Sequence, residues 1–431
     1  MIVRESGSKG VRIQRVRTTI GLNMLLTLML ASIGITPYLS RNFSNVAYLL
    51  IFILWIVSAL LANQFRIRFS MHDSVVWWTV AYIFLQLFMR VVGHSNLSWK
   101  IYINRLPVLA IPVMMLFILK KYNQNEKKRL LCGLSIIIII NLLSNFLYIN
   151  NRELFDQVYV VGSQAWGSNV GGTTFVCVCM FWSAACLVLV IHTKHFFQRM
   201  TYALCFFVTV YYLLAVNQRA IALVLMIVML IGIVYVSYKG EKKVDYFLRI
   251  IVAIVLVCII YHFMIPILET VRSMFSSQRM LDRLDALISF LNGNSLFDGG
   301  QSSFEKRIQL AKVSIDTFTH SGTTILFGVG EQNHGDSINE LIQYGVGNHS
   351  ELLDCLAMFG IFGGIVYGLV FSILRLICSL PKNVMLKREA IVMASVFTVY
   401  AFVNKILSAD ILYMICMVFP LVLQKIDNEN L

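Results

Sequence analysis

The chain has 431 residues, of which 58% are hydrophobic and 13% are charged. A soluble globular domain carries about 25% charged residues, so this composition excludes that class. The formal net charge of +14 reports loop topology in a membrane protein and is no sign of nucleic-acid binding. Apolar runs of about 20 residues recur along the chain and strand-type alternation is absent, which predicts an all-α polytopic membrane protein.

In chain order, the apolar runs predict about twelve membrane-spanning helices. They cover residues 19–39, 46–62, 74–92, 101–119, 131–150, 170–191, 201–217, 220–238, 248–268, 350–378, 389–405 and 409–424. The stretch before the first run is basic. We expect it to be retained together with the first helix, because that apolar run is too long for the core of a signal peptide.

Lysine and arginine are concentrated in every second loop, for example at 120–129 and 382–388. The positive-inside rule predicts that these loops and both termini are cytoplasmic. The long polar loop then lies outside the cytoplasmic membrane. The expected organisation is residues 1–268 with nine spans, an extracytoplasmic loop at 269–348, and residues 349–431 with the last three spans.

The long loop has helical character of its own. Apolar residues recur at helical spacing over 276–291 and again over 304–318, and glycine-containing turns at 292–294 and 298–300 separate the two segments. Polar loops of this length are uncommon and usually functional. The sequence therefore predicts a small cap of amphipathic helices against the outer leaflet.

Two arginines on the predicted outer side are candidate functional residues. Arg219 stands at a helix end flanked by apolar sequence. A charge at such a position costs free energy, so it is usually paired or functional. The ordinary alternative is an arginine that extends to the membrane interface. Arg307 lies beside Lys306 on the second loop helix. The ordinary alternative is that Arg307 only belongs to a solvated face of this helix.

His349 stands where the polar loop meets a long apolar helix. Asn348 is the predicted N-cap of that helix and Glu351 the residue that reaches back to complete a capping box, so we expect Glu351 to be structural. The partial positive charge of a helix N-terminus disfavours imidazolium. A neutral His349 could then accept a proton from a hydroxyl, and the same N-terminus would attract a phosphate. The alternative is a simple boundary residue.

Arg105 is a weaker candidate for substrate binding. It lies a few residues into the fourth span, near the predicted outer side, where it could line a cavity with Trp99 and Lys100. The nine cysteines show no zinc spacing, and a metal site at His192 and His195, which flank a predicted cytoplasmic turn, is improbable. No outer Asp-x-Asp pair and no P-loop occurs, so we expect neither a metal nor a cofactor.

Three local sequences carry a family resemblance. They are Asn217-Gln218-Arg219-Ala220; Arg307 with the helix after it and Phe327-Gly328-Val329-Gly330; and His349-Ser350-Glu351-Leu352-Leu353 with Gly360-Ile361-Phe362-Gly363. In their order along the chain and in their predicted side of the membrane, these motifs resemble those of the polysaccharide polymerase and O-antigen ligase superfamily (Wzy-type polymerases and their ligase relatives). Members have about a dozen spans, a large late external loop and three recurrent basic positions.

The likeness in organisation covers the whole chain, whereas the specific motifs cover only about 215–365. Gln218, Ala220 and Ser350 replace the Ser, Gly and Asn that are usual in the family, which puts a fixed hydrogen-bonding role for these flanking positions in doubt. The three basic residues themselves match.

The resemblance implies a metal-independent, inverting glycosyltransferase that makes capsule, exopolysaccharide or O-antigen. Its donor would be a glycan on undecaprenyl diphosphate and its acceptor one lipid-linked repeat unit. Membrane lipids, a flippase and a chain-length regulator are implied partners. Arg219 and Arg307 would hold the diphosphate and His349 would orient or deprotonate the acceptor hydroxyl.

Three alternatives stay open, and one of them is a non-catalytic membrane assembly protein. A ligase would move finished glycan to a lipid or protein acceptor with the same residues. A lipid-linked oligosaccharide flippase or another transporter also has about twelve spans, but transporters usually show two related halves and mid-membrane polar sites. Here the polar residues are concentrated externally and late in the chain, with no evident repeat.

Overall fold

The computed structural model describes residues 4–92, except 62–73, then residues 98–149, 173–216, 220–237, 303–331 and 343–429, with isolated positions between them. Every regular element in these residues is a helix, as the sequence predicts. The elements before the long loop are α1 (Arg4–Ile35), α2 (Pro37–Asn42), α3 (Asn45–Leu61), α4 (Ser74–Val91), α5 (Trp99–Lys121), α6 (Gln124–Ile149), α8 (Thr173–His192), α9 (Phe196–Val216) and α10 (Ala220–Ser237).

The loop and the C-terminal part add a second set of helices. These are α13 (Ser303–Thr319), α14 (Gly322–Phe327), α16 (Glu351–Phe359), the 3-10 turn η2 (Gly360–Gly363), α17 (Gly364–Ser379), α18 (Val384–Val403), α19 (Ala409–Tyr413), the π-helical turn η3 (Met414–Val418) and α20 (Phe419–Glu429). The predicted loop helix over 304–318 is confirmed by α13. Most of the other, at 276–291, lies outside the described residues.

Six helices of the described residues are long and apolar enough to cross a membrane, and shorter apolar helices accompany them. The chain is therefore a multi-pass membrane protein. The predicted span at 248–268 lies outside the described residues, and every other predicted span falls on a helix. The full number of crossings, about twelve, stays a prediction.

The last helical segment and α8 form the centre of the bundle. Within their apolar windows, 83% and 78% of the residues are buried inside the protein. Phe181 of α8 packs edge to face against Phe397 of α18 and Phe419 of α20, with ring centroids 6.0 and 5.5 Å apart. Aromatic side chains bury large apolar areas, so this contact fixes three helices around one point.

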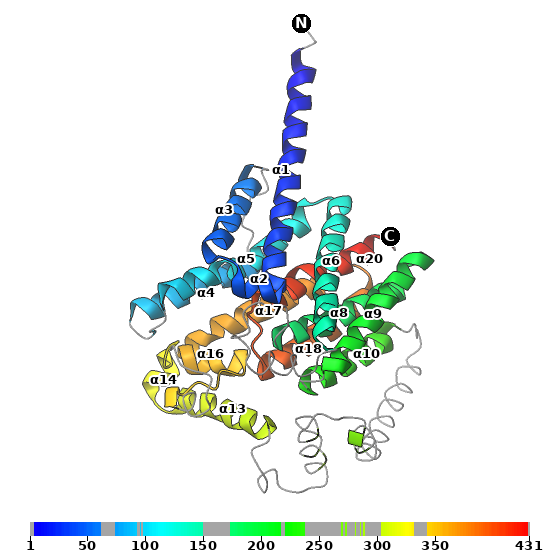
Figure 1. Cartoon of the computed structure of the whole chain (residues 1–431). Coiled ribbons are helices and arrows are strands. Elements are labelled where there is room, and N and C mark those ends of the chain that lie inside the picture. Colours follow the sequence, from blue (N-terminus) through cyan, green and yellow to red (C-terminus); the bar gives the residue numbers. More distant parts are fainter. Residues whose placement is uncertain are drawn as a thin grey trace.

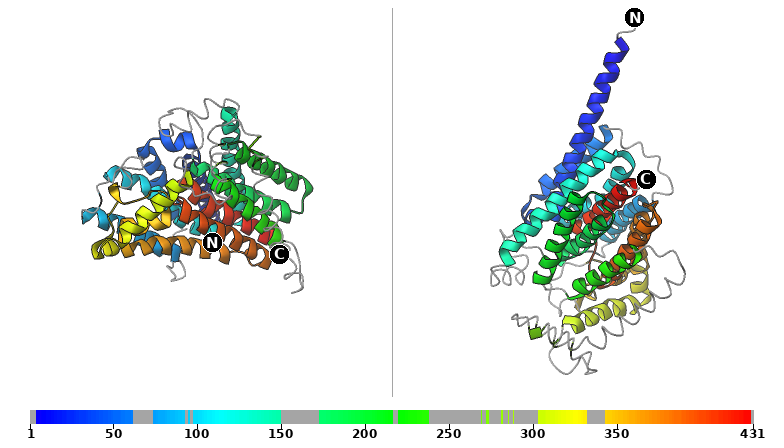
Figure 2. Two further views of the ribbon diagram at one scale, coloured as in Figure 1. Left: turned by 90° about the horizontal axis from the view of Figure 1, so that it is seen from below. Right: turned by 90° about the vertical axis from the view of Figure 1, so that its right-hand side faces the viewer.

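The loop helices lie at one end of the molecule. In Figure 1 and in the right panel of Figure 2, α13 and α14 lie at the opposite end from the N-terminus of α1, which projects from the bundle. The predicted helix over 350–378 is interrupted, because Gly360 has φ +59° and ends α16. A Cβ at Gly360 would lie 2.5 Å from the carbonyl oxygen of Ile325, so the backbone of α14 crosses closely at that break.

Glycines 360, 364 and 368 predict a smooth face for close helix packing, and the structure bears this out only in part. Gly368 packs directly on the ring of Trp78 in α4, whereas a Cβ at Gly364 would meet nothing within 4 Å. Gly360 instead ends α16, at the break between this helix and η2.

Candidate functional site

The turn that carries His349 leads directly into α16. Its N-cap is Ser350, whose hydroxyl accepts a hydrogen bond of 3.1 Å from the backbone N–H of Leu353. The predicted capping box of Asn348 and Glu351 is therefore wrong. Asn348 adopts a left-handed conformation with φ +55°, a region that asparagine tolerates better than most residues. This conformation turns the chain sharply just before His349.

Glu351 fastens the start of α16 to the segment after α18. Its carboxylate accepts hydrogen bonds from the backbone N–H groups of Ile406 and Leu407, at 3.1 and 3.2 Å. Its own N–H donates to the carbonyl of Asn404. Glu351 is thus structural, as expected, but through contacts that join distant parts of the chain.

A buried carboxylate lies beneath the His349 turn. Asp354, 1% exposed, accepts hydrogen bonds from the Ser314 hydroxyl at 2.6 Å and from the backbone N–H of Ser350 at 2.9 Å. The Ser314 hydroxyl in turn accepts from the N–H of Gly347 at 2.9 Å. This Ser314–Asp354 network joins the loop helix α13, the turn before α16, and α16 itself.

Position 307 faces the same turn. Residues 307, 310 and 314 follow helical spacing and share one face of α13. On that face, Ser314 belongs to the network, and the backbone of Leu310 lies so close to Gly347 that a Cβ there would meet the Leu310 carbonyl oxygen at 2.2 Å. The structure describes the backbone of Arg307 but not its side chain. Helix α13 packs on the turn before α16, and position 307 lies on the face of α13 that meets this turn.

Two residues with basic side chains, His349 and Lys405, flank the start of α16. Both side chains are exposed, and both act electrostatically on the buried Asp354. The Lys405 ammonium donates a hydrogen bond to the side-chain oxygen of Asn348. With the helix N-terminus, they form a surface that favours an anion. Sequence reasoning overlooked Lys405, although a lysine at the outer end of the predicted span 389–405 is a basic residue on the base-poor side.

The glycine turn after α14 packs on the far end of α16. The N–H groups of Val329 and Gly330 donate to the carbonyls of Ala357 and Met358, at 2.9 and 2.8 Å. Gly328 and Gly330 have φ +68° and +76°, which glycine adopts without steric cost. This geometry fixes the next residue, Glu331, relative to α16.

Arg105 pairs with that residue. Its Nη1 lies 2.6 Å from Oε2 of Glu331, which is 226 positions away in the chain. Glu331 directly follows the turn that is hydrogen-bonded to Ala357 and Met358, so this pair lies beside the C-terminal end of α16. Trp99 packs against Tyr102 and beneath the guanidinium of Arg90. The cavity that Arg105 is expected to line with Trp99 and Lys100 stays a prediction.

The structure thus brings position 307 to the turn that carries His349, and it places Arg105 and its unforeseen partner Glu331 at the other end of α16. Arg219 lies outside the described residues. In the part of the chain that is described, no group of three or more His, Cys, Asp or Glu side chains has an arrangement that could hold a metal ion.

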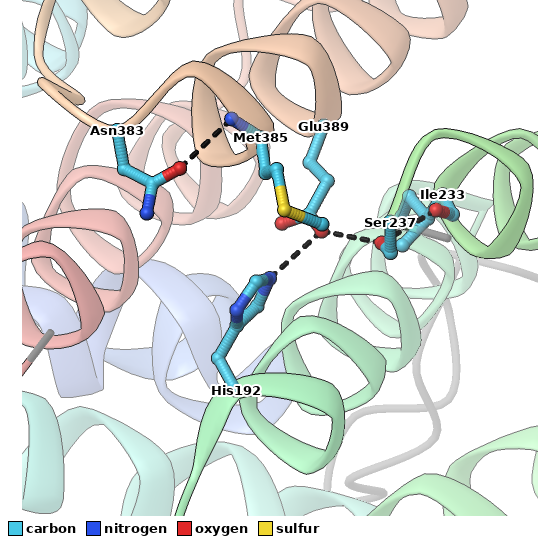
Figure 3. Close-up of polar contacts among 6 residues, drawn as sticks. All are labelled: His192, Ile233, Ser237, Asn383, Met385 and Glu389. Atoms are coloured by element: carbon cyan, nitrogen blue, oxygen red, sulfur yellow. Dashed lines mark hydrogen bonds and ion pairs between the residues drawn. The ribbon is translucent and has the colours of Figure 1, made fainter. Parts of the chain in front are cut away.

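A second polar cluster occurs at the opposite end of the bundle. Glu389 of α18 is fully buried, and its Oε1 lies 2.8 Å from Nε2 of His192 and accepts a hydrogen bond from the Ser237 hydroxyl (Figure 3). Residues 389 and 404 are separated by roughly 22 Å of helix at 1.5 Å per residue. His192, Ser237 and Glu389 come from segment ends that the charge pattern assigns to one side, and the site above comes from ends assigned to the other.

Replacing Asp354 with alanine is expected to lower the free energy of unfolding by about 2–4 kcal/mol, because the Ser314 hydroxyl and the Ser350 N–H would lose a buried acceptor. Thermal unfolding of the detergent-purified protein measures this effect. Asp316→Ala is the matched control, since Asp316 is exposed on the same helix α13 and its loss should leave stability within about 0.5 kcal/mol. Equal effects of the two variants would contradict a buried structural role for Asp354.

Comparison with known proteins agrees with the resemblance described for the sequence. Residues 180–368 match a family model described as O-antigen ligase. The match begins inside α8, ends in α17, and contains positions 219, 307 and 349, whereas Arg105 precedes it. A search of the curated proteins finds no significant match.

Proposed function

We propose that this chain, whose residues 180–368 match a family model described as O-antigen ligase, is a polysaccharide polymerase of the cytoplasmic membrane. It joins repeat units carried on undecaprenyl diphosphate to make capsule, exopolysaccharide or O-antigen. The observation that carries the proposal is the face of α13 that holds Arg307 and packs, through Ser314, on the turn that holds His349.

In the proposed reaction, the acceptor's sugar hydroxyl attacks the anomeric carbon of the donor, and undecaprenyl diphosphate leaves as the C–O bond to it breaks. His349 orients the hydroxyl or takes its proton. Arg307 and Arg219 stabilise the negative charge that develops on the leaving group, for which bidentate guanidinium groups are well suited. Displacement in one step inverts the anomeric centre.

The side of the membrane follows from the same proposal. Lipid-linked repeat units are used on the outer face, so the loop and His349 lie outside and both termini are cytoplasmic. The charge pattern of the loops supports this orientation. A flippase would supply the substrate and a chain-length regulator would limit the product, and we propose both as partners. Arg105 is a further substrate-binding residue in this scheme.

A second candidate is a ligase that transfers finished glycan to a lipid or protein acceptor. The description of the matching family favours it, and the same arginines and histidine would serve it. The two reactions differ in what they consume, because a polymerase uses single repeat units and a ligase uses completed polymer.

The lipid-linked glycan profile of a strain lacking this protein separates the two candidates. We expect single repeat units on undecaprenyl diphosphate to accumulate and long-chain glycan to disappear, which mass spectrometry of the lipid extract would record. Full-length lipid-linked polymer would identify a ligase instead. An unchanged profile, with normal surface glycan, would exclude both forms of glycan transfer.

A further inference from the structure

The ion pair of Arg105 and Glu331 joins two elements that meet only in the folded protein. Arg105 lies near the start of α5, and Glu331 directly follows the glycine turn that is hydrogen-bonded to α16. Their contact of 2.6 Å uses one oxygen and one N–H group. A guanidinium has five N–H donors, and within the described residues this is the one hydrogen bond that the Arg105 side chain makes.

The two partners differ in their access to water. The Glu331 side chain is 9% exposed, whereas that of Arg105 is 36% exposed. A nearly buried carboxylate is expensive unless it is paired, so Glu331 depends on Arg105. Arg105 depends less on Glu331, because its side chain is partly exposed and, within the described residues, its guanidinium makes one hydrogen bond. A second anion could therefore reach Arg105 from outside.

A diphosphate would bind such a group more strongly than one carboxylate oxygen does. It carries more negative charge and can engage two N–H groups of a guanidinium at once. The proposed substrates carry a diphosphate. Arg105 pairs with Glu331, which follows the glycine turn bonded to the last turn of α16, and the His349 turn precedes the other end of that helix. In the proposed complex the diphosphate lies at Arg105.

We propose that Glu331 is an internal competitor for the anion site at Arg105: it pairs with the guanidinium when the site is empty and is displaced by the diphosphate of the lipid-linked substrate. This inference rests on the proposed function. In this role Glu331 weakens substrate binding by the free energy of the pair that must be broken. It also keeps the isolated arginine from holding other phosphates at the membrane surface.

A purely structural ion pair predicts the opposite sign. If the pair only fastened the glycine turn to α5, removing Glu331 would loosen the site and weaken anion binding. If Glu331 competes for Arg105, removing it strengthens binding. The sign of the change in affinity therefore decides between the two.

The test uses the full-length protein in nanodiscs, with inorganic pyrophosphate as the probe in titration calorimetry. Glu331→Gln is expected to bind pyrophosphate roughly tenfold more tightly than the unmodified protein. Asp316→Asn, which removes one charge from an exposed site on the same loop, should leave the affinity within about twofold. Arg105→Gln should weaken binding, and Arg105→Gln/Glu331→Gln should bind as weakly as Arg105→Gln alone, because the gain requires the arginine.

Weaker or unchanged binding by Glu331→Gln would overturn the proposal, as would a gain that persists without Arg105. If Glu331→Gln does not yield folded protein by size exclusion, Glu331→Asp replaces it, since the shorter side chain draws the carboxylate back and should also tighten binding. Pyrophosphate affinity does not require catalysis. If the proposed polymerase function is wrong, a separate measurement shows it, because strains that carry active-site variants then make unchanged glycan.

Discussion

Replacing His349 with alanine is expected to abolish long-chain polysaccharide, with a loss of transfer rate of roughly 10²–10⁴-fold, the usual contribution of a positioned acid or base. The side chain is exposed, so its removal leaves no cavity and should leave the protein in the membrane at its normal level. Gel analysis of the glycan, with an immunoblot of the membrane fraction, measures both quantities in a strain that carries only the variant.

Arg307→Ala should give the same loss, because position 307 shares the face of α13 that turns toward His349. Two matched controls lie on the same loop. His320 and Lys312 are exposed at the end and along the side of α13, and their replacement by alanine should leave the chain-length distribution unchanged. Full-length polymer from both His349→Ala and Arg307→Ala would refute the proposed mechanism.

The largest expected effect on stability comes from Glu389, at the other end of the bundle. Glu389→Ala removes a fully buried carboxylate and leaves His192 and Ser237 without their shared acceptor. Breaking a buried pair in this way costs about 3–5 kcal/mol. We therefore expect a marked fall in the melting temperature of the purified protein and a lower amount in the membrane.

The control for Glu389 is its exposed neighbour Lys387, whose replacement by alanine should change stability by no more than about 0.5 kcal/mol. Because Glu389 lies roughly 22 Å along α18 from the start of α16, the surviving folded Glu389→Ala protein should retain its transfer rate per molecule. If the variant is stable but its transfer rate per molecule is lost, Glu389 takes part in the reaction instead. Scanning fluorimetry and a rate normalised to folded protein distinguish these outcomes.

The sequence predicts the elements that carry the candidate site residues, and it does not predict the partners of those residues. His349 stands at a boundary between polar and apolar sequence, and Arg307 stands in a run with helical spacing. Both features can be predicted because they depend only on residues that are close together in the sequence. The Ser314–Asp354 network, Lys405 beside Asn348, and Glu331 beside Arg105 join residues between 40 and 226 positions apart. Such contacts depend on how helices pack, and no local pattern encodes them.

The capping error at α16 has the same origin. Asn348, Ser350 and Glu351 are all plausible residues for a helix start, and the sequence favours a box between the first and the third. In the structure the backbone of Asn348 is left-handed, and Glu351 turns to the N–H groups that follow α18. Ser350 is then the remaining side chain that can accept from Leu353.

The sequence by itself determined the class of the protein and, within the described residues, the positions of its long apolar helices. An apolar run of about 20 residues can satisfy its backbone hydrogen bonds in lipid only as a helix, so hydropathy alone locates it. The tertiary structure alone decided where α16 begins, how the glycine at 360 breaks the tenth predicted span, and which buried charges pair. Those features depend on neighbouring helices, because a buried charge or a tight backbone crossing is stable only when a distant segment supplies its partner.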